Sequence, residues 1–357
     1  MYYDGANNND PKWLIKTMYY KQQLSSLFMF LLCLCLTSFS IQAQELPTRS
    51  FCIFDPIGEK GPAYQGMLDY KAAALEWGAL LDLHVYTNEA VALADFKAGH
   101  CDAVGLTGTR IRPFNKFTAT IEAVGAIDDY EQMRKLVGML ANPKASKYMI
   151  EGDYEVAGIM PGGAVFVFVR DKAIDSVEAA AGKRLATIDY DIASLKVVKH
   201  IGATMVPVSI ATFAPRFNNG YVDIAYAPAI AYEPFEMYKG IGDKGGILRF
   251  NLAQMNGQLI LRKDRFPAQY GQKSREYAYS NFTKALEHII KAEKGIPEKY
   301  WIDLPEEKHV KYKEMLRQVR IELKNEGIYD PRMLKILFKL RCRTTPGHYE
   351  CVENLED

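Results

Sequence analysis

The chain has 357 residues, of which 48% are hydrophobic and 24% are charged, a composition typical of a folded globular protein that excludes disorder over most of its length. The length fits two domains or one large domain. The formal net charge is +1, from 44 Lys and Arg against 43 Asp and Glu, which argues against a general nucleic-acid binder, an acidic tail and a polybasic membrane patch.

The N-terminal segment is predicted to be a targeting signal. Residues 24–41 form an uncharged, mostly apolar run preceded by Lys16 and Lys21, and Ala43 follows it. These features indicate a secretory signal peptide cleaved after Ala43, with Met18 as the expected start of the signal. The predicted location is therefore the periplasm. The alternative is an uncleaved membrane anchor, because the run is just long enough to span a bilayer.

Four cysteines follow the predicted signal: Cys52, Cys101, Cys342 and Cys351. An even number in an exported protein predicts disulfides, with three possible connectivities. Cys342 and Cys351 flank a short loop with a Pro-Gly turn, whereas Cys52 and Cys101 each begin a strand-like run. Because adjacent parallel strands would bring the latter pair within range, we favour Cys52–Cys101 and Cys342–Cys351 over four unpaired thiols. The sequence has no CxxC or HxxxH cluster, so no metal site is predicted.

The first half of the chain alternates strands and helices, which predicts a parallel sheet of right-handed βαβ units. The expected elements are strand 50–55, helix 64–78, strand 81–87, helix 89–98 and strand 101–106. In open parallel sheets, ligands bind beyond the carboxyl ends of the strands. Thr107, Arg110 and Arg112 follow the third strand and are predicted ligand donors, with a surface role as the alternative for the arginines. The loop 55–64 would either hold an anion at a helix N-terminus or form a plain turn.

An internal repeat relates this half to a later segment. Residues 87–104 align without gaps with residues 208–225, which pairs Phe96 with Phe217, Gly99 with Gly220, and Asp102 with Asp223. The second copy predicts strand 184–188, helix 191–201, strand 204–208, helix 210–218 and strand 222–226. Two α/β lobes of equal design imply a cleft between them.

Polar and aromatic residues also follow the strands of the second copy. Asp189 and Tyr190 come after its first strand, and the carboxylates of Asp189 and Asp191 could bind a cation or act as acid and base. We prefer a helix N-cap role for Asp191. Tyr226 and Tyr232 follow the repeated G-x-x-D, where phenols would line a pocket, with core packing as the alternative.

Residues 154–240 resemble the substrate-binding subunit of tripartite ATP-independent periplasmic (TRAP) transporters. The shared order is a Gly-rich strand, a K-x-I, a helix ending in Gly-Lys, a V-P-V strand, a G-x-V-D and an E-x-Y-K. The chain is also similar to a divergent group of such proteins that is sometimes labelled as associated with resistance-nodulation-division efflux. It departs from the family in two respects: Ala186 stands where an Arg usually clamps a substrate carboxylate, and Tyr226 and Ala227 stand where the family has a polar residue after the G-x-V-D.

The C-terminal third is predicted to be helical over 274–297, 305–327 and a segment that opens at Asp330, packed across the back of both lobes. We therefore expect an α/β, two-lobed fold of the type II periplasmic-binding-protein kind, with parallel-type sheets in each lobe, an interlobe cleft and a helical C-terminal region. The chain crosses between lobes near Gly158 and near residues 248–261. The expected boundaries are a signal at 1–43, lobe 1 at 44–157 with part of about 248–270, lobe 2 at 158–247, and C-terminal helices at 271–357.

The predicted function is that of an exported, non-enzymatic and monomeric receptor that captures a small molecule between its lobes without a cofactor. The TRAP resemblance implies delivery to inner-membrane transporter subunits. Two alternatives remain: an enzyme on the same scaffold that uses Asp189 and a first-lobe Arg, and an accessory or sensor subunit of an efflux or signalling complex. The sequence has no G-x-S-x-G, HExxH or Walker motif, which lowers the expectation of an enzyme.

Overall fold

The computed structural model describes residues 18–19, 46–347, 349–353 and 355. The predicted signal peptide, including its cleavage site after Ala43, lies outside the described residues except for positions 18 and 19. Among the helices of the described part, none is long and apolar enough to cross a membrane. Residues 46–357 form one compact unit, whose architecture is given below.

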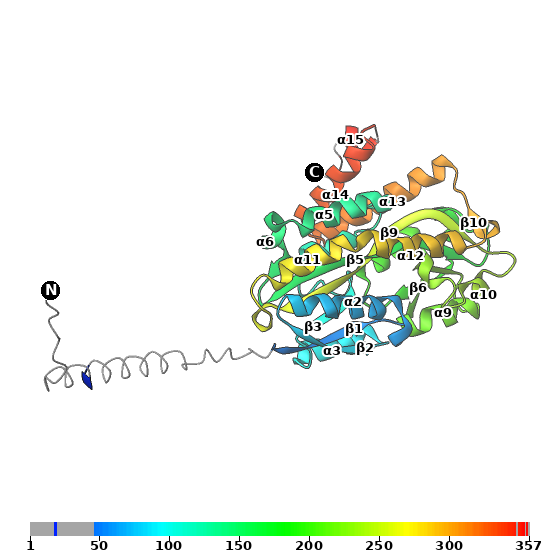
Figure 1. The fold of residues 1–357 in the computed structure, drawn as a ribbon. Coiled ribbons are helices and arrows are strands. Elements are labelled where there is room, and N and C mark those ends of the chain that lie inside the picture. Colours follow the sequence, from blue (N-terminus) through cyan, green and yellow to red (C-terminus); the bar gives the residue numbers. More distant parts are fainter. Residues whose placement is uncertain (1–17, 20–45, 348, 354, 356–357) are drawn as a thin grey trace, which may run out of the picture. The chain divides into compact units, whose positions relative to one another are not determined.

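This unit is built on one ten-stranded sheet surrounded by helices (Figure 1). The main path of the sheet runs β2-β1-β3-β9-β5-β8-β6-β7, while β10 (Trp301–Ile302) pairs with β9 and β4 (Ile150–Glu151) with β5. One end contains β1 (Thr48–Phe54), β2 (Leu80–Tyr86) and β3 (Ala103–Thr107), and the other contains β6 (Arg184–Ile188), β7 (Thr204–Val208) and β8 (Ile224–Pro228). Within each end the strands are parallel, with β1 or β6 in the middle. The α/β class and the parallel strands at each end are thereby confirmed, although both ends belong to one continuous sheet.

Two long antiparallel strands join the ends: β5 (Tyr154–Val169) and β9 (Gly246–Arg262). Their pairing shifts register three times, and one shift lies between Pro161 and Gly163. Gly163 has a φ of 106°, a conformation that favours glycine. We expected chain crossings here but not two continuous strands, because glycines interrupt both segments and β5 is buried on both faces for much of its length.

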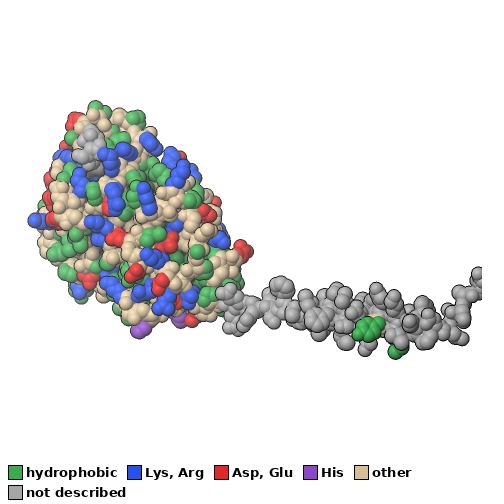
Figure 2. All heavy atoms as spheres, turned by 90° about the vertical axis from the view of Figure 1, so that its left-hand side faces the viewer, with side chains coloured by type: hydrophobic (Ala, Val, Ile, Leu, Met, Phe, Trp, Pro, Cys, Tyr) green, Lys and Arg blue, Asp and Glu red, His purple; other side chains and the backbone are tan. Residues whose placement is uncertain are grey.

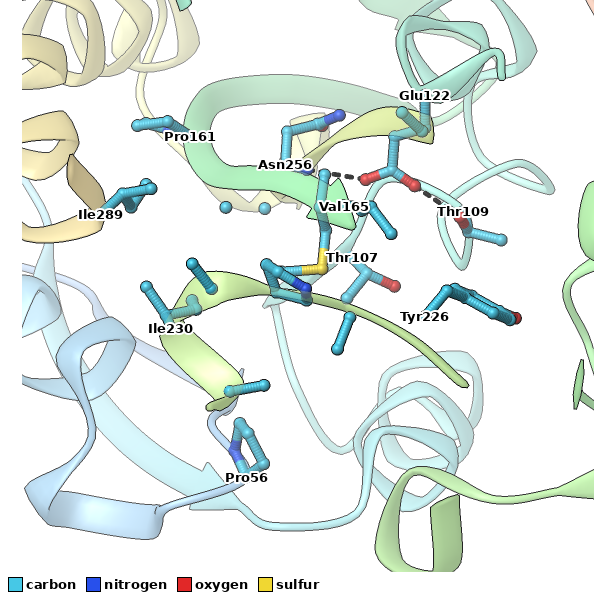
Figure 3. A pocket seen from close by; sticks show the side chains of 18 of the residues that line it. Pro56, Thr107, Thr109, Glu122, Pro161, Val165, Tyr226, Ile230, Asn256 and Ile289 are labelled. Atoms are coloured by element: carbon cyan, nitrogen blue, oxygen red, sulfur yellow. Dashed lines mark hydrogen bonds between the residues drawn. The ribbon is translucent and has the colours of Figure 1, made fainter. Parts of the chain in front are cut away.

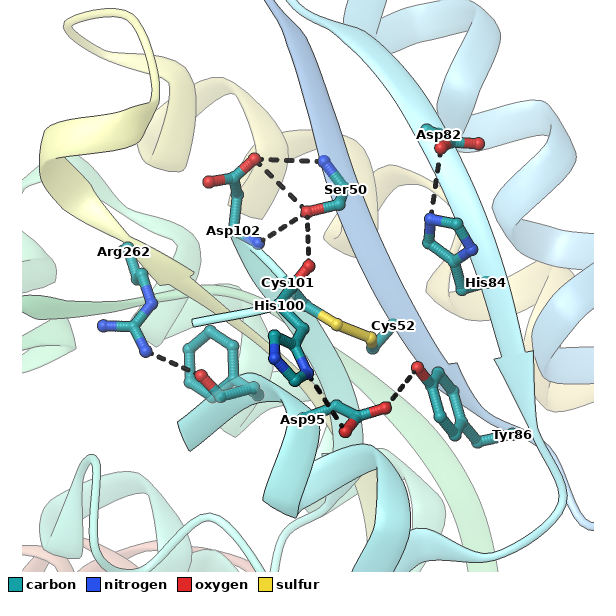
Figure 4. Close-up of a disulfide and its surroundings, with 11 residues drawn as sticks. Ser50, Cys52, Asp82, His84, Tyr86, Asp95, His100, Cys101, Asp102 and Arg262 are labelled. Atoms are coloured by element: carbon teal, nitrogen blue, oxygen red, sulfur yellow. Dashed lines mark hydrogen bonds and ion pairs between the residues drawn. A yellow bond between two sulfur atoms is a disulfide. The ribbon is translucent and has the colours of Figure 1, made fainter. Parts of the chain in front are cut away.

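The repeat is visible in the backbone. Gly99 and Gly220 end α3 (Glu89–Ala98) and α9 (Ile210–Asn218) with φ values of 85° and 75°. The Asp102 carboxylate accepts the Ser50 N–H at 3.1 Å, and the Asp223 carboxylate accepts the Arg184 N–H at 2.9 Å. Each aspartate therefore fixes the beginning of the central strand of its own half, as Figure 4 shows for the first half.

Both predicted disulfides are present. Cys52 of β1 is bonded to Cys101, directly before β3, with Cα atoms 5.9 Å apart (Figure 4). Cys342 of α14 (Pro331–Thr344) is bonded to Cys351 of α15 (Tyr349–Val352), with Cα atoms 5.5 Å apart. The second disulfide holds Glu350 within ion-pair distance of Arg320 and Arg341, at 3.5 and 3.4 Å.

The C-terminal helices are α11 (Tyr270–Ser280), α12 (Phe282–Gly295), α13 (Glu306–Asn325) and α14. The expectation of a single helix over 274–297 was wrong, because α11 ends at Ser280 and α12 begins at Phe282. The Nδ2 of Asn281, between them, donates to the Tyr277 carbonyl at 3.0 Å. α13 packs against α8 (Ile192–Ile201), where His200 Nε2 lies 2.9 Å from Glu322 Oε1.

The remaining helices include two of three or more turns, α2 (Pro62–Glu76) and α5 (Tyr130–Ala141). Short α-helices are α4 (Lys116–Ala119), α6 (Ser146–Met149), α7 (Val177–Ala180) and α10 (Met237–Ile241). The 3₁₀ turns are η1 (Gly58–Lys60), η2 (Thr120–Glu122), η3 (Pro143–Ala145), η4 (Ala229–Ala231), η5 (Lys263–Arg265) and η6 (Glu298–Tyr300). Basic and acidic side chains are interspersed on the face drawn in Figure 2, in keeping with the near-zero net charge.

Candidate functional site

A cavity of about 1260 Å³ lies where the two ends of the sheet meet. Its lining comes from the segments after β1 and β3, from the segments after β6 and β8, and from β5 and β9. Most of the lining is apolar, and in Figure 3 Pro161, Ile230 and Ile289 lie on the side opposite Glu122 and Thr109. The volume exceeds the roughly 300–1,000 Å³ of common ligand pockets.

Three predicted site residues meet at one buried carboxylate, that of Glu89, which is 1% exposed. Glu89 Oε1 accepts the Thr107 N–H and hydroxyl, each at 2.7 Å, and Oε2 accepts the Tyr190 hydroxyl at 2.7 Å. Arg110 Nε lies 3.4 Å from Oε2, and the Arg110 guanidinium stacks 3.2 Å from the centroid of the Tyr190 ring. Both Glu89 carboxylate oxygens therefore have hydrogen-bond or ion-pair partners within this cluster.

This cluster connects the two ends of the sheet. Glu89, Thr107 and Arg110 belong to the first copy of the repeat, whereas Tyr190 follows β6 of the second copy. Burial and the Glu89 carboxylate raise the pKa of Tyr190 far above its usual range, so its phenol remains a hydrogen-bond donor at physiological pH. The Tyr190–Glu89 hydrogen bond therefore spans the two halves beside the cavity.

Glu122, at the end of η2, presents a second carboxylate to the cavity. Its Oε1 accepts the Asn256 N–H at 2.8 Å, and its Oε2 accepts the Thr109 hydroxyl. Burial raises the pKa of Glu122 to about 7, and the negative charges of Asp191 and Glu89 contribute in the same direction. Within the described part of the chain, Glu122 forms no ion pair.

Asp191 provides the third carboxylate, at the start of α8. Its side chain accepts the Ser194 N–H at 3.1 Å, so the predicted N-cap is confirmed. Its other oxygen accepts the hydroxyl of Tyr226, a predicted site residue, at 3.1 Å. Burial raises the pKa of Asp191 above its usual value. Asp191 and Tyr226 both line the cavity.

The other candidates are placed differently. Arg112 lines the cavity, but its Nη1 donates to the Ile328 carbonyl at 2.6 Å and its guanidinium lies 5.4 Å from the Tyr329 ring centroid. Asp189 is exposed and is not part of the lining. Tyr232 is 3% exposed and packs against Tyr238 and Tyr300 in the core of the second half, outside the lining.

Two further expectations about the site have clear structural outcomes. The loop 55–64 forms a plain turn, because the Asp55 carboxylate accepts the N–H groups of Ala63 and Tyr64 at 2.9 and 3.1 Å and so occupies the N-terminus of α2. Ala186 is buried in the core of the second half, whereas its neighbour Leu185 lines the cavity. A side chain at position 186, where the family usually has its Arg, would thus lie in this core and not in the cavity lining.

Glu89, Glu122 and Asn256 were not predicted from the sequence. Glu89 follows a helix cap and resembles an ordinary first-turn acid, and Glu122 lies in a short turn without periodic pattern. A signal existed for Asn256, because β9 carries polar amides at alternate positions, at Gln254, Asn256 and Gln258, and all three are at most 3% exposed. Buried amides at period two in an apolar strand indicate a polar site.

Sequence comparisons find relatives over most of the chain. Residues 71–356 match the family model described as solute-binding protein AdeT 1/2. The chain is 42% identical over 304 residues to the "Probable solute-binding protein AdeT1" of Acinetobacter baumannii, covering 85% of this chain and all of that protein. It is 26% identical over 228 residues to "Probable solute-binding protein AdeT2" of the same organism, covering 64% of this chain and 96% of that protein.

Structural comparison finds the same architecture in TRAP periplasmic solute-binding proteins. A protein from Haemophilus influenzae with bound L-gulonate aligns with a TM-score of 0.68 at 10% identity, covering 82% of this chain and 99% of that one. A protein from Ralstonia eutropha with bound (S)-2-acetolactate aligns with a TM-score of 0.67 at 12% identity, covering 83% and 99%. At these identities the likeness is one of fold.

Proposed function

The chain belongs to the AdeT 1/2 family of solute-binding proteins, and we propose that it captures one small molecule per chain in the cavity between the two ends of its sheet. The observation that carries this proposal is the convergence of polar groups from both copies of the repeat on one largely apolar cavity. Thr107 and Glu122 belong to the first half, and Asp191 and Tyr226 to the second. A ligand in contact with both halves would favour their closed arrangement.

We propose that β5 and β9 are the hinge of this closure. The two ends of the sheet then act as lobes, approximately 44–157 with part of 248–270, and 158–247, with the C-terminal helices from 271 onward packed on both. The register shifts in the β5–β9 pair, and the glycine conformation at Gly163, support bending there.

We further propose that a cleavable signal delivers the protein to the periplasm, where as a monomer it hands its ligand to membrane transporter subunits. Membership of a solute-binding family supports binding without chemical conversion. An enzyme that used Asp189 would lose turnover of its substrate on Asp189→Asn. A receptor would keep its affinity in that variant, because the Asp189 side chain is exposed and outside the cavity lining.

The test is native mass spectrometry after incubation with the small-molecule fraction of host-cell extract. Wild-type protein should retain one ligand per chain. Ile230→Trp should not, because the larger side chain fills the cavity that Ile230 lines. The matched control is Ile192→Trp, at a position that is 38% exposed and outside the lining. Equal capture by wild type and Ile230→Trp, or no capture by wild type, would contradict the proposal.

A further inference from the structure

Glu122 has an unusual environment for a carboxylate in a largely apolar cavity. Each of its oxygens accepts one hydrogen bond, from the Asn256 N–H and from the Thr109 hydroxyl. An ionised carboxylate can accept about four hydrogen bonds, so half of this capacity is unused by these donors. Two more deeply buried carboxylates have cationic or multiple N–H partners: Glu89 has Arg110, and Asp55 caps α2.

A second, independent observation lies beside it. Asn256 is 1% exposed and lines the cavity, yet its Nδ2 has no hydrogen-bond partner within the described residues. The orientation of the amide is fixed, because Asn256 Oδ1 accepts the Gln258 Nε2 at 2.8 Å, and that nitrogen also donates to the Thr118 carbonyl at 3.0 Å. A buried amide donor without a partner costs free energy, so this region beside Glu122 is not optimised for stability alone.

The two groups form one subsite. Asn256 and Glu122 lie next to each other in Figure 3, and a Cβ atom at Gly108 would lie 2.8 Å from both Asn256 Oδ1 and the Glu122 carboxyl carbon. Gly108 therefore leaves the space that these two polar side chains occupy. The subsite presents the Glu122 carboxylate as an acceptor, with Asn256 packed beside it, on the wall opposite the apolar Pro161, Ile230 and Ile289.

We infer that the solute is an amine with an apolar body, whose ammonium group pairs with the Glu122 carboxylate. This inference rests on the proposed function and adds the chemical class of the ligand to it. An ammonium group supplies the charge and the donors that Glu122 lacks, and the apolar lining accommodates the rest of the molecule.

The charges that act most directly on the Glu122 carboxyl are negative, although the cavity lining also contains Lys60, Arg112, Lys284 and Lys291. Asp191 and Glu89 add negative charge, and the Glu89 charge is shared with Arg110. Arg112 is held by the Ile328 carbonyl and the Tyr329 ring. Near η2, Asp330 and Arg332 pair with each other at 2.7 Å. The phenols of Tyr190, Tyr226 and Tyr329 have pKa values raised by burial and stay neutral.

The test compares ligands of one shape and different charge by calorimetry at pH 8. The probes are phenylalaninol, 3-phenylpropylamine, 3-phenylpropan-1-ol and 3-phenylpropionate. Phenylalaninol and 3-phenylpropylamine should both bind more tightly than the alcohol, and the carboxylate should bind least tightly. Glu122→Gln should weaken binding of both amines at least tenfold and leave the alcohol within twofold. Asp243→Asn, at an exposed acid outside the cavity, should change nothing.

The inference is overturned if neither amine binds more tightly than its alcohol or carboxylate counterpart, which includes the case in which no probe binds. It is also overturned if Glu122→Gln weakens all probes equally, as a merely structural role would. The melting temperature of Glu122→Gln, measured alongside, shows that the variant is folded. The two proposals can fail separately. If the amine probes fail but wild-type protein captures a ligand from extract and Ile230→Trp does not, the amine assignment is wrong and the receptor function is still supported.

Discussion

At the scale of single residues, the ionisation of Glu122 makes the stability of the folded chain depend on pH. Its pKa is raised to about 7 in the folded chain from an ordinary 4.5, so the folded state binds the proton more tightly than the unfolded state. The contribution of this group to the free energy of unfolding therefore decreases as pH rises from about 4.5 to about 7. Burial is the main cause.

We predict that Glu122→Gln is more stable than wild type at pH 8, by up to about 3 kcal/mol, and that the two proteins converge toward pH 4.5. Asp191 also has a raised pKa, but it is present in both proteins, so their difference isolates Glu122. Urea denaturation at several pH values measures it. A constant difference across the pH range would show that the carboxyl has the same pKa folded and unfolded.

Some of the site could be read at this scale from the sequence. Thr107, Arg110 and Tyr190 follow strands whose carboxyl ends meet at one edge of a sheet, so their proximity follows from the predicted topology. Glu122 could not be found in this way. It is placed by a hydrogen bond to Asn256, 134 positions away, and no local pattern in a short turn indicates such a contact.

At the scale of elements, the repeated aspartates fix the central strand of each half. Asp102 accepts the Ser50 N–H at 3.1 Å, and Asp223 accepts Arg184 through its N–H at 2.9 Å and its guanidinium at 2.7 Å. Removal of either carboxylate leaves an N–H near the beginning of a strand without this acceptor.

We predict that Asp102→Ala and Asp223→Ala each lower the free energy of unfolding by about 1–2 kcal/mol. The ion pair between the Arg184 guanidinium and Asp223 is exposed and adds little to the free energy of unfolding. Asp243→Asn, an exposed acid in no ion pair among the described residues, should be neutral. Chemical denaturation gives all three values. A cost from only one of the two alanine variants would indicate that the copies do not use the aspartate in the same way.

The repeat made the elements of both ends predictable, whereas the middle of the sheet was not. β5 is buried on both faces for much of its length, and glycines interrupt both strands. β9 does alternate over residues 254–258, but its polar residues there are buried instead of facing solvent. The break between α11 and α12 was missed because the helical pattern of the sequence continues through it. Apolar residues at helical spacing continue across Asn281, so periodicity alone predicts one helix.

At the scale of the whole molecule, the Tyr190–Glu89 hydrogen bond is a direct link between the halves of the repeat. Tyr190→Phe removes this bond and keeps the ring that stacks on Arg110. We predict that the two halves of Tyr190→Phe sample more open arrangements than those of wild type. Spin labels at Val91 and Met205, which are 45% and 49% exposed, would report the distance between halves.

The expected result is a longer and broader distance distribution in Tyr190→Phe. Tyr221→Phe is the matched control, because Tyr221 is 62% exposed and outside the cavity lining. Identical distributions in the two variants would mean that the Tyr190 hydroxyl does not hold the halves together. A two-lobed design could be predicted from the repeat, but this contact could not, because it depends on the side-chain packing of segments 101 positions apart.

The central claim is that a small molecule binds between the two halves. Hydrogen–deuterium exchange with and without the small-molecule fraction of host-cell extract tests it most directly. We predict slower exchange in cavity-lining segments of both halves, 105–112 and 120–124 in the first and 188–194 and 224–230 in the second, and loss of this protection in Ile230→Trp. Unchanged exchange in wild type, protection confined to one half, or equal protection in Ile230→Trp would contradict the account.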